Sequence, residues 1–394
     1  MALGLYISVP FCRTKCSYCN FASDVFSRAV FERYVDRVCA DIRNAATTAD
    51  QMGGQIDFAV DSIYLGGGTP TLLDITQLER LFVTISQNFK IQPDTEITVE
   101  CAPGTLNPAA LECLHRCGVN RVSLGVQSFV DQEAASVGRL HTRQIVLDDI
   151  ARLRAAGITD LNIDLIAGLP HQTRESWEFS LDQVVACDGP HASVYMLEVD
   201  EDSRLGRELI AGGTRYHAHS VPDDDLIADL YIAACERFEC HGIPQYEISN
   251  FSRPGHESRH NLKYWTRQPY LGFGVDAHSM LPAAEKHMAA VRFSTPDSLE
   301  QFAVAGPLTR TPVSPDSALE EAFFLGLRLN RGIDLRQITK QFGEHPANRH
   351  SETIKDLLNS GLLEKQGCIV RLTPRGRLLA NEVFERFIST PETV

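Results

Sequence analysis

The chain alternates short apolar runs with longer amphipathic stretches. The apolar runs are rich in β-branched residues, which favours strands, and the stretches between them repeat apolar residues at helical spacing. The predicted strands are Leu5–Val9, Ser62–Leu65, Glu96–Glu100, Arg121–Val126, Leu161–Ile166 and Ser193–Val199, and the predicted helices include Phe31–Ala46, Ile75–Phe89, Ile145–Ala156 and Ser176–Cys187. Alternation of strand and helix predicts a parallel sheet with right-handed crossovers. Because there are six units rather than eight, we expect an α/β fold in which residues 1–235 form an open, partial (β/α)6 TIM-like barrel.

Polar residues or glycines stand near the ends of these strands. Gly67 follows the second strand, Glu100 ends the third, Gln127 ends the fourth, Asp164 lies in the fifth and Glu198 lies in the sixth. In barrels of this kind the carboxyl ends of the strands, and the loops after them, form the active face. One polar strand end is often only the start of a loop, but five in phase predict a functional face.

The rest of the chain has a different pattern. Residues 236–300 are interrupted by prolines and glycines, and we expect an irregular extension there. From Asp316, three helical segments are followed by a strand, a turn and a last helix, which predicts a small α+β, winged-helix-like domain over residues 301–385. A structural or lid-like role is favoured for it over DNA binding. Disorder is expected only in the final residues, TPETV.

Composition narrows the possible partners and location. A chain of 394 residues with 43% hydrophobic residues fits a globular protein with one large and one small domain. Its net charge of −14 lacks the basic surface that extended nucleic-acid binding needs, so no nucleic-acid partner is expected. No secretory leader and no apolar run of roughly 18 residues is visible. We therefore expect a cytoplasmic protein without an integral membrane segment, which leaves room for peripheral membrane association.

Three of the 11 cysteines, Cys12, Cys16 and Cys19, form a CxxxCxxC loop after the first strand. In a reducing compartment such cysteines are thiols or metal ligands. Three thiolates are one fewer than a [4Fe–4S] cube binds, which leaves one iron open to another ligand. A zinc knuckle or a chance cluster of cysteines is the alternative. Cys113 and Cys117 lie four residues apart in a predicted helix, where packing is favoured over a second metal site.

A glycine-rich stretch, GGGTP at residues 66–70, directly follows the second strand. Glycines let a backbone approach a ligand and present its amides. The chain has neither GxxxxGK[ST] nor GxGxxG, so this stretch does not match the usual phosphate-binding loops. Taken alone, GGGTP could equally be a tight turn.

Together these motifs resemble the oxygen-independent coproporphyrinogen III oxidase branch of the radical S-adenosylmethionine (SAM) superfamily. The resemblance is carried by ISVPFC and the cysteine loop, GGGTP, VECAPGTL, VSLGVQSF with VGRLH, and NIDLIAGLPHQT, and it covers most of the chain, the C-terminal domain included. It implies that Cys12, Cys16 and Cys19 ligate a [4Fe–4S] cluster. It also implies a SAM site made of Tyr6, Tyr18, Gly67, Gly68, Thr69, Glu100, Gln127, Arg139 and Asp164.

Two features depart from the oxidases of that branch. Their cysteine motif continues as CxxxCxxCxC, whereas this chain has Phe21 at the last position. They also carry an extension ahead of the cluster loop, whereas here eleven residues precede Cys12. Both departures argue against porphyrinogen decarboxylation.

The segment RPGHESRHNLKYW holds an HNxxYW motif that resembles the signature of HemW-type haem chaperones. The resemblance implies that His260, Asn261, Tyr264 and Trp265 bind haem. If the segment is helical, Arg259, Lys263 and Arg267 share a face. Those cations would suit the haem propionates, and the aromatic rings would suit the macrocycle. An imidazole would suit the haem iron. The alternative is a packed Tyr–Trp pair with a satisfied histidine, and His256, His278 and Tyr246 are further candidates that the sequence does not rank.

Three functional hypotheses follow. The favoured one is a haem chaperone that binds haem and a SAM-ligated [4Fe–4S] cluster and passes haem to acceptor apoproteins, respiratory proteins among them. The second is an oxygen-independent coproporphyrinogen III oxidase, and the third a radical SAM enzyme acting on an unrelated substrate. The sequence does not decide whether SAM is cleaved, so enzymatic activity is left open.

Overall fold

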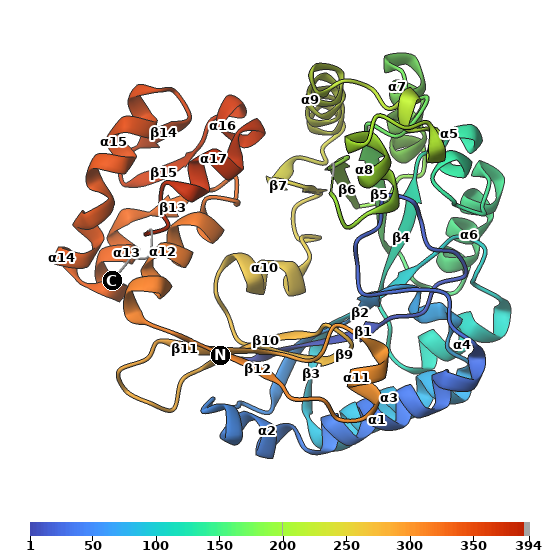
Figure 1. Cartoon of the computed structure of the whole chain (residues 1–394), viewed down its shortest axis with the longest axis horizontal. Coiled ribbons are helices and arrows are strands. Elements are labelled where there is room, and N and C mark those ends of the chain that lie inside the picture. Colours follow the sequence, from blue (N-terminus) through green and yellow to red (C-terminus); the bar gives the residue numbers. More distant parts are fainter. Residues whose placement is uncertain (199, 390–394) are drawn as a thin grey trace.

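Six parallel strands form the centre of the protein in the computed structural model, which describes residues 1–198 and 200–389. They are β1 (Leu3–Val9), β2 (Ala59–Gly67), β3 (Lys90–Cys101), β4 (Arg121–Gln127), β5 (Asp160–Ala167) and β6 (His191–Met196). They lie side by side in chain order, and every neighbouring pair is parallel (Figure 1). The predicted α/β fold with a partial (β/α)6 barrel is therefore confirmed. Val199 and the TPETV terminus, which the sequence analysis mentioned, lie outside the described residues.

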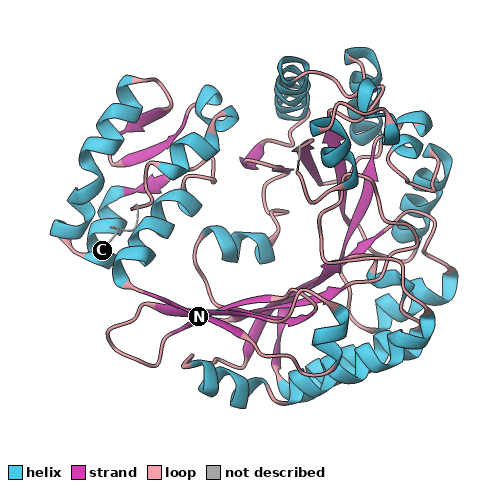
Figure 2. Cartoon of the chain, in the orientation of Figure 1, coloured by secondary structure: helices cyan, strands magenta, loops and turns pink. Residues whose placement is uncertain are grey.

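Helices cover the outer face of this curved sheet (Figure 2). Along β1, Leu5, Ile7 and Val9 are fully buried in the main hydrophobic core, while Tyr6 and Ser8 alternate with them and line a cavity on the inner side. The helices of this part are α1 (Phe31–Arg43), α2 (Ala45–Met52), α3 (Ile75–Asn88), α4 (Pro108–Arg116), α5 (Asp131–Ser136), α6 (Arg143–Ala155), α7 (Arg174–Ala186), α8 (Arg204–Ile210) and α9 (Asp224–Cys240). The inner side is thus the polar one, and it holds the predicted site.

The stretch 236–300, expected to be irregular, instead extends the sheet at both edges, together with one strand, β12, that follows it in the chain. The added strands are β7 (Gln245–Glu247), β8 (Asn250–Ser252), β9 (Tyr270–Gly274), β10 (His278–Pro282), β11 (Ala290–Ser294) and β12 (Thr309–Val313). β9 pairs in parallel with β1 and leads to antiparallel β10, β11 and β12, while β8 and β7 follow β6, giving a 12-stranded sheet. These strands have only three to five residues, too few for a periodic pattern to be visible in the sequence.

The C-terminal part is a small α+β domain, as predicted. Its strands β13 (Ile333–Asp334), β14 (Leu363–Gln366) and β15 (Ile369–Leu372) form an antiparallel sheet in the order β13-β15-β14. Its helices are α12 (Pro315–Gly326), α13 (Leu335–Phe342), α14 (Glu344–Ala347), α15 (Ser351–Asn359), α16 (Pro374–Leu378) and α17 (Ala380–Glu385), and α11 (Leu299–Ala303) precedes them. Phe323, Val370 and Phe387 belong to a hydrophobic cluster separate from the main core.

One short helix, α10 (Arg259–Trp265), lies on the inner side of the curved sheet (Figure 1). It lies toward the amino-terminal ends of the strands. A Cβ on Gly4, near the start of β1, would meet Lys263 and His260, and Glu96 of β3 accepts hydrogen bonds from the first turn of α10. The HNxxYW segment therefore closes the end of the half-barrel opposite to the cysteine loop.

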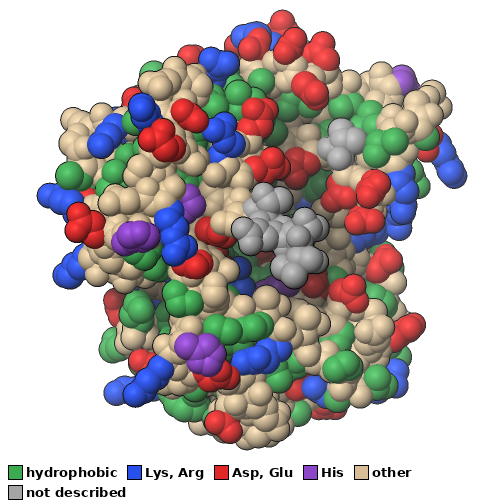
Figure 3. Space-filling view, turned by 60° about the vertical axis from the view of Figure 1, so that its left-hand side comes forward, with side chains coloured by type: hydrophobic (Ala, Val, Ile, Leu, Met, Phe, Trp, Pro, Cys, Tyr) green, Lys and Arg blue, Asp and Glu red, His purple; other side chains and the backbone are tan. Residues whose placement is uncertain are grey.

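On the face drawn in Figure 3, Lys and Arg side chains are scattered among Asp and Glu, without a continuous basic area among the residues described there. None of the helices within residues 1–198 and 200–389 has the length and apolar character that crossing a bilayer requires.

Candidate functional site

The cysteine loop follows β1 at the carboxyl edge of the sheet and is held there by backbone contacts. The Cys12 amide donates to the Asp24 carbonyl over 3.0 Å, and the Ser17 amide donates to the Val137 carbonyl over 3.1 Å. Within the loop, the Lys15 ammonium donates to the carbonyls of Phe21 and Ser23 at 2.6 and 2.7 Å. The loop is therefore held in place by hydrogen bonds to the segments on either side of it.

Cys12, Cys16 and Cys19 are free, partly buried thiols that line one central cavity. Burial raises the pKa of the Cys12 thiol, so a metal has to displace its proton on binding. Among the described residues, no three His, Cys, Asp or Glu side chains converge as they would around a single metal ion. A [4Fe–4S] cube does not need that convergence, because each cysteine binds a different iron. Cys113 is buried within α4, with its sulfur 3.8 Å from the Ile75 carbonyl, as helix packing predicts.

The central cavity has a volume of about 680 Å³. Cavities that hold small ligands typically span ~300–1,000 Å³. Apart from Tyr6, every residue predicted for the SAM site lines it together with the cysteines, namely Tyr18, Gly67, Gly68, Thr69, Glu100, Gln127, Arg139 and Asp164. These residues come from the loops and strand ends of β1 to β5, so the fold brings them to one edge. Tyr6 lies deeper, beside a second cavity that it shares with Gly67.

The glycine stretch after β2 requires glycine for two reasons. Gly67 has a φ of +99°, which disfavours other residues. A Cβ on Gly68 would lie 2.7 Å from the Phe11 carbonyl oxygen, against the backbone of the cysteine loop. The Gly67 amide donates to Glu100 Oε2 over 3.0 Å. GGGTP therefore joins β1, β2 and β3 at the cavity wall.

Glu100 is a partly buried carboxylate in this wall. Its Oε1 accepts from the Tyr64 hydroxyl over 3.0 Å. Burial, reinforced by the nearby Asp164, raises the pKa of Glu100 to about 7. Asp164 itself accepts from Ser123 at 3.0 Å and from Asn162 at 2.7 Å. Two neighbouring carboxylates thus face a cavity that a cationic, hydroxyl-bearing ligand would suit.

Two other side chains at the cavity, Gln127 and Arg139, each carry a buried polar atom without a partner among the described residues. Gln127 has a φ of 69°, and its Oε1 is buried without a hydrogen bond among the described residues. Arg139 donates to the Tyr18 hydroxyl over 2.8 Å, whereas its Nε is buried and unpaired in the same part of the structure. Buried unpaired polar atoms cost roughly 1–3 kcal/mol each unless a ligand satisfies them. The Arg139 donor, the Gln127 acceptor and the carboxylates of Glu100 and Asp164 therefore fit SAM. SAM carries a carboxylate for the donor, and an amino group and ribose hydroxyls for the acceptors.

At the opposite end of the half-barrel, the His260 imidazole is enclosed. Its Nδ1 lies 3.1 Å from Ser62 Oγ and its Nε2 lies 2.8 Å from the Tyr264 hydroxyl. The ring packs near Tyr6 and Tyr64, with ring centroids 6.1 and 5.4 Å away, and burial lowers the pKa of His260 to about 3. Haem ligation by His260 would require one of these contacts to break, so it stays a prediction.

The cations expected to share a face are not available as a group. Lys263 is buried, with Nζ 2.7 Å from Asp61 and donating to the Ala2 carbonyl over 2.9 Å. Arg267 follows the end of α10 with a φ of 53° and pairs with Glu321 of α12 at 2.8 Å. Arg259 lies 3.3 Å from Asp94. The expectation of a free cationic stripe for propionates was wrong, because each cation meets a carboxylate that is distant in sequence.

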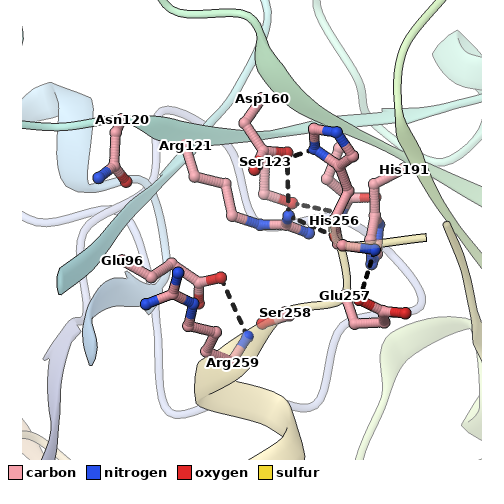
Figure 4. Close-up of polar contacts among 12 residues, drawn as sticks. Glu96, Asn120, Arg121, Ser123, Asp160, His191, His256, Glu257, Ser258 and Arg259 are labelled. Carbon is pink, nitrogen blue, oxygen red and sulfur yellow. Dashed lines mark hydrogen bonds and ion pairs between the residues drawn. The ribbon is translucent and has the colours of Figure 1, made fainter. Parts of the chain in front are cut away.

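A polar network holds the segment before α10 against the strand starts (Figure 4). Arg121 pairs with Asp160 at 3.1 Å and donates to the His256 carbonyl at 3.1 Å. Glu96 accepts from the amides of Arg259 and His260 at 3.0 and 3.1 Å. Tyr246, another sequence candidate, lies with its hydroxyl 3.0 Å from His191 Nε2. These residues anchor α10.

Some cavity residues could not be found from the sequence. Arg328, Arg377 and Asn381 reach the central cavity from the C-terminal part of the chain, where no local pattern marks them. Arg328 also lies over the Trp265 ring, 4.3 Å from its centroid, so the C-terminal part contacts the HNxxYW helix. Glu198 lines the cavity as well, but β6 ends at Met196, so Glu198 belongs to the following loop rather than to the strand end.

Known proteins resemble this chain over most of its length. A family model of the radical SAM superfamily matches residues 6–184, and one of the HemN C-terminal domain matches residues 313–379. The chain is 34% identical to the heme chaperone HemW of Bacillus subtilis over 97% of this chain and 98% of the relative. It is 35% identical to the heme chaperone HemW of Synechocystis over 86% of this chain and 81% of the relative. The solved coproporphyrinogen III oxidase (HemN) of Escherichia coli, a radical SAM enzyme, superposes with a TM-score of 0.82 at 25% identity, covering 98% of this chain and 90% of that one.

Proposed function

This chain belongs to the HemW family of radical SAM proteins, and we propose that it is a haem chaperone that also binds a SAM-ligated [4Fe–4S] cluster. The membership confirms the resemblance read from the sequence motifs. The observation that carries the proposal is the near full-length match to a relative named as a haem chaperone, over 97% of this chain. Haem and the acceptor proteins are therefore its proposed partners, with respiratory apoproteins among the acceptors and the cytoplasm as the place of action.

In this proposal Cys12, Cys16 and Cys19 would hold the cluster, which would leave one iron open to SAM. A reduced cluster of this kind can supply an electron to the sulfonium of SAM. The chain's own residues position SAM: Arg139 and Gln127 offer the unpaired groups described above, and Glu100 and Asp164 accept from its hydroxyls or amino group. The backbone of Gly67, Gly68 and Thr69 forms the wall beside it.

Haem is proposed to bind near the HNxxYW helix, through His260, Asn261, Tyr264 or Trp265. Of these, Tyr264 lines the second cavity, which also reaches Phe21 of the cysteine loop. That cavity connects the predicted haem motif with the cluster end of the half-barrel. Burial and pairing of His260 and Lys263 favour a part for α10 as a scaffold of the site, with its aromatic side chains toward the ligand.

Phe21 favours the chaperone over the oxidase. It occupies the position of the fourth cysteine in the oxidases, and its side chain is 64% exposed although it is apolar. An exposed aromatic ring at the mouth of both cavities suits contact with a flat apolar ligand. It cannot ligate iron.

The test is a haem titration of the anaerobically reconstituted protein, followed by mixing of the loaded protein with a haem-free acceptor such as an apocytochrome b. We expect saturable binding with a shifted Soret band and transfer of haem to the acceptor. Cys240→Ser, which changes an exposed cysteine far from the loop in sequence, is the control for thiol effects. Absence of saturable haem binding by the reconstituted wild type would overturn the proposal.

A further inference from the structure

A second cavity of about 290 Å³ lies beside the cluster loop, at the junction of β1, β9 and β10. Its wall includes the rings of Tyr6, Phe21, Tyr264, Tyr270 and His278, together with Asp276. Tyr264 and Tyr270 pack edge to face with ring centroids 4.6 Å apart. The cavity is small for a whole macrocycle, near the lower end of ~300–1,000 Å³, so it would take one edge of a flat ligand and leave the rest in solvent.

His278 is the histidine of this cavity, and its environment differs from that of His260. Its side chain is 68% exposed, and its Nε2 lies 3.5 Å from Asp276 Oδ1. No hydrogen bond to Nδ1 is found within the described part of the chain. Imidazoles that ligate metals commonly carry a carboxylate on their other nitrogen, which fixes the ring and raises its basicity. Asp276 lies close enough to one nitrogen of His278 to take that part after a small movement of the two exposed side chains, whereas both nitrogens of His260 are taken.

The residues that line the second cavity suit the apolar edge of a porphyrin and leave its charged propionate edge in solvent. Four of the lining side chains are aromatic rings besides the imidazole, and none is Lys or Arg among the residues described. Rings suit the apolar pyrrole edge of a porphyrin, while propionates stay in water where their charge is solvated. Phe21, exposed at the rim, can pack on the face of such a ligand.

From this juxtaposition we infer that His278 supplies the imidazole that ligates the haem iron, with Phe21 and Tyr264 packing on the macrocycle. The inference rests on the proposed function, since it names the iron ligand of the haem that the chaperone carries. It also places haem next to the cluster loop, because Phe21 lies two residues after Cys19 and lines both cavities.

Other histidines are less suited to this role. His141 borders the central cavity, but its side chain is buried and its Nε2 lies 3.1 Å from the Val126 carbonyl. His256 is placed at the opposite end of the half-barrel, 3.5 Å from Asp160 (Figure 4). Neither shares a cavity with the HNxxYW motif.

The experiment compares His278→Ala with His287→Ala in the full-length reconstituted protein. His287 is a matched control because it is also exposed, at 74%, and also lies beside a carboxylate, 3.3 Å from Glu285, but outside the cavity. We expect His278→Ala to weaken haem binding at least tenfold and to change the Soret maximum and the electron paramagnetic resonance spectrum of bound ferric haem. Adding imidazole to His278→Gly should restore the wild-type spectrum. Phe21→Ala should weaken binding several-fold without changing the spectrum.

Unchanged affinity and spectrum in His278→Ala would overturn the inference while leaving the proposed function intact. If His260→Ala or His141→Ala loses the wild-type haem spectrum while His278→Ala keeps it, the inference is also overturned. The histidine whose replacement changes the spectrum is then the iron ligand. A wild-type protein that binds no haem would instead refute the proposed function. Far-UV circular dichroism and the absorption of the cluster are measured for each variant. They distinguish a variant that has lost a haem ligand from one that has lost its fold.

Discussion

The two ends of the half-barrel both hold buried polar atoms, but they differ in how their charged side chains are paired and in whether a large cavity lies beside them. At the amino-terminal ends of the strands, Arg121 meets Asp160 and Lys263 meets Asp61. At the carboxyl ends, Gln127 Oε1 and Arg139 Nε are buried without partners among the described residues, beside a cavity of about 680 Å³. Because unpaired buried groups are costly, those that border the large cavity mark the end that a ligand completes, whereas the ion pairs of the other end support the fold. Substitutions at the two ends should therefore separate binding from stability.

The largest effect is expected in the cysteine loop. Cys16→Ser should abolish the cluster, because only two thiolates remain in the loop to hold it. Iron content and visible absorption after anaerobic reconstitution measure this loss, with Cys240→Ser retaining both. A Cys16→Ser protein with wild-type iron content would show that this cysteine is not a ligand.

At the paired end, Lys263→Met should destabilise the fold by about 2–3 kcal/mol. The Lys263 side chain is only 2% exposed and that of Asp61 is 30% exposed, so the loss lies at or below the lower limit of the ~3–5 kcal/mol typical of a broken buried pair. Denaturant unfolding of the purified protein gives the value. SAM affinity should change little, and a variant with wild-type stability but weakened SAM binding would reverse the roles assigned to the two ends.

At the unpaired end, Arg139→Met should show the opposite behaviour. Removing the guanidinium takes away a charged hydrogen-bond donor worth about 1.5–3 kcal/mol, so the Kd for SAM should rise about 10- to 100-fold. Unfolding free energy should stay within about 1 kcal/mol of wild type, because the lost Tyr18 contact is offset by removal of an unpaired buried Nε. Calorimetric titration with SAM and denaturant unfolding test the two halves of this prediction, and a large loss of stability with normal SAM binding would contradict it.

A smaller, pH-dependent effect is expected at Glu100. Its pKa of about 7 lies above its ordinary value because of burial and Asp164. SAM binding that uses the carboxylate should weaken by at most about tenfold for each pH unit below 7. Between the ordinary pKa of 4.5 and about 7, the folded protein holds a proton that the unfolded chain has lost, so stability falls as pH rises through this window. Glu100→Gln should flatten both profiles, and profiles unchanged by that substitution would exclude Glu100 as their source.

The sequence was informative about the end that binds ligands and much less so about the paired end. Strands β1 to β6 and the residues at their carboxyl ends could be predicted because each has a local pattern, a short apolar run followed by a loop signal. The pairing of Lys263 with Asp61, or of Arg267 with Glu321, could not, because the partners are far apart in the chain. A motif rich in cations therefore suggested a binding face, although the fold uses those cations to anchor α10.

The short strands β7 to β12 and the C-terminal arginines were missed for a related reason. Strands of three to five residues show no period, and their place in the sheet depends on pairing with β1 and β6. Arg328 and Arg377 reach the central cavity only because the C-terminal part of the chain packs across it. Likewise, His278 could be named as a candidate from the sequence, but its cavity and its difference from His260 are properties of the fold.

The most direct measurement is an anaerobic reaction of the reconstituted protein with coproporphyrinogen III, SAM and a reductant, run in parallel with transfer of bound haem to an apocytochrome. A haem chaperone on this scaffold should deliver haem to the acceptor and form no protoporphyrinogen. Protoporphyrinogen formed at a catalytic rate, without transfer of haem, would contradict the proposed function and assign the chain to the oxidases.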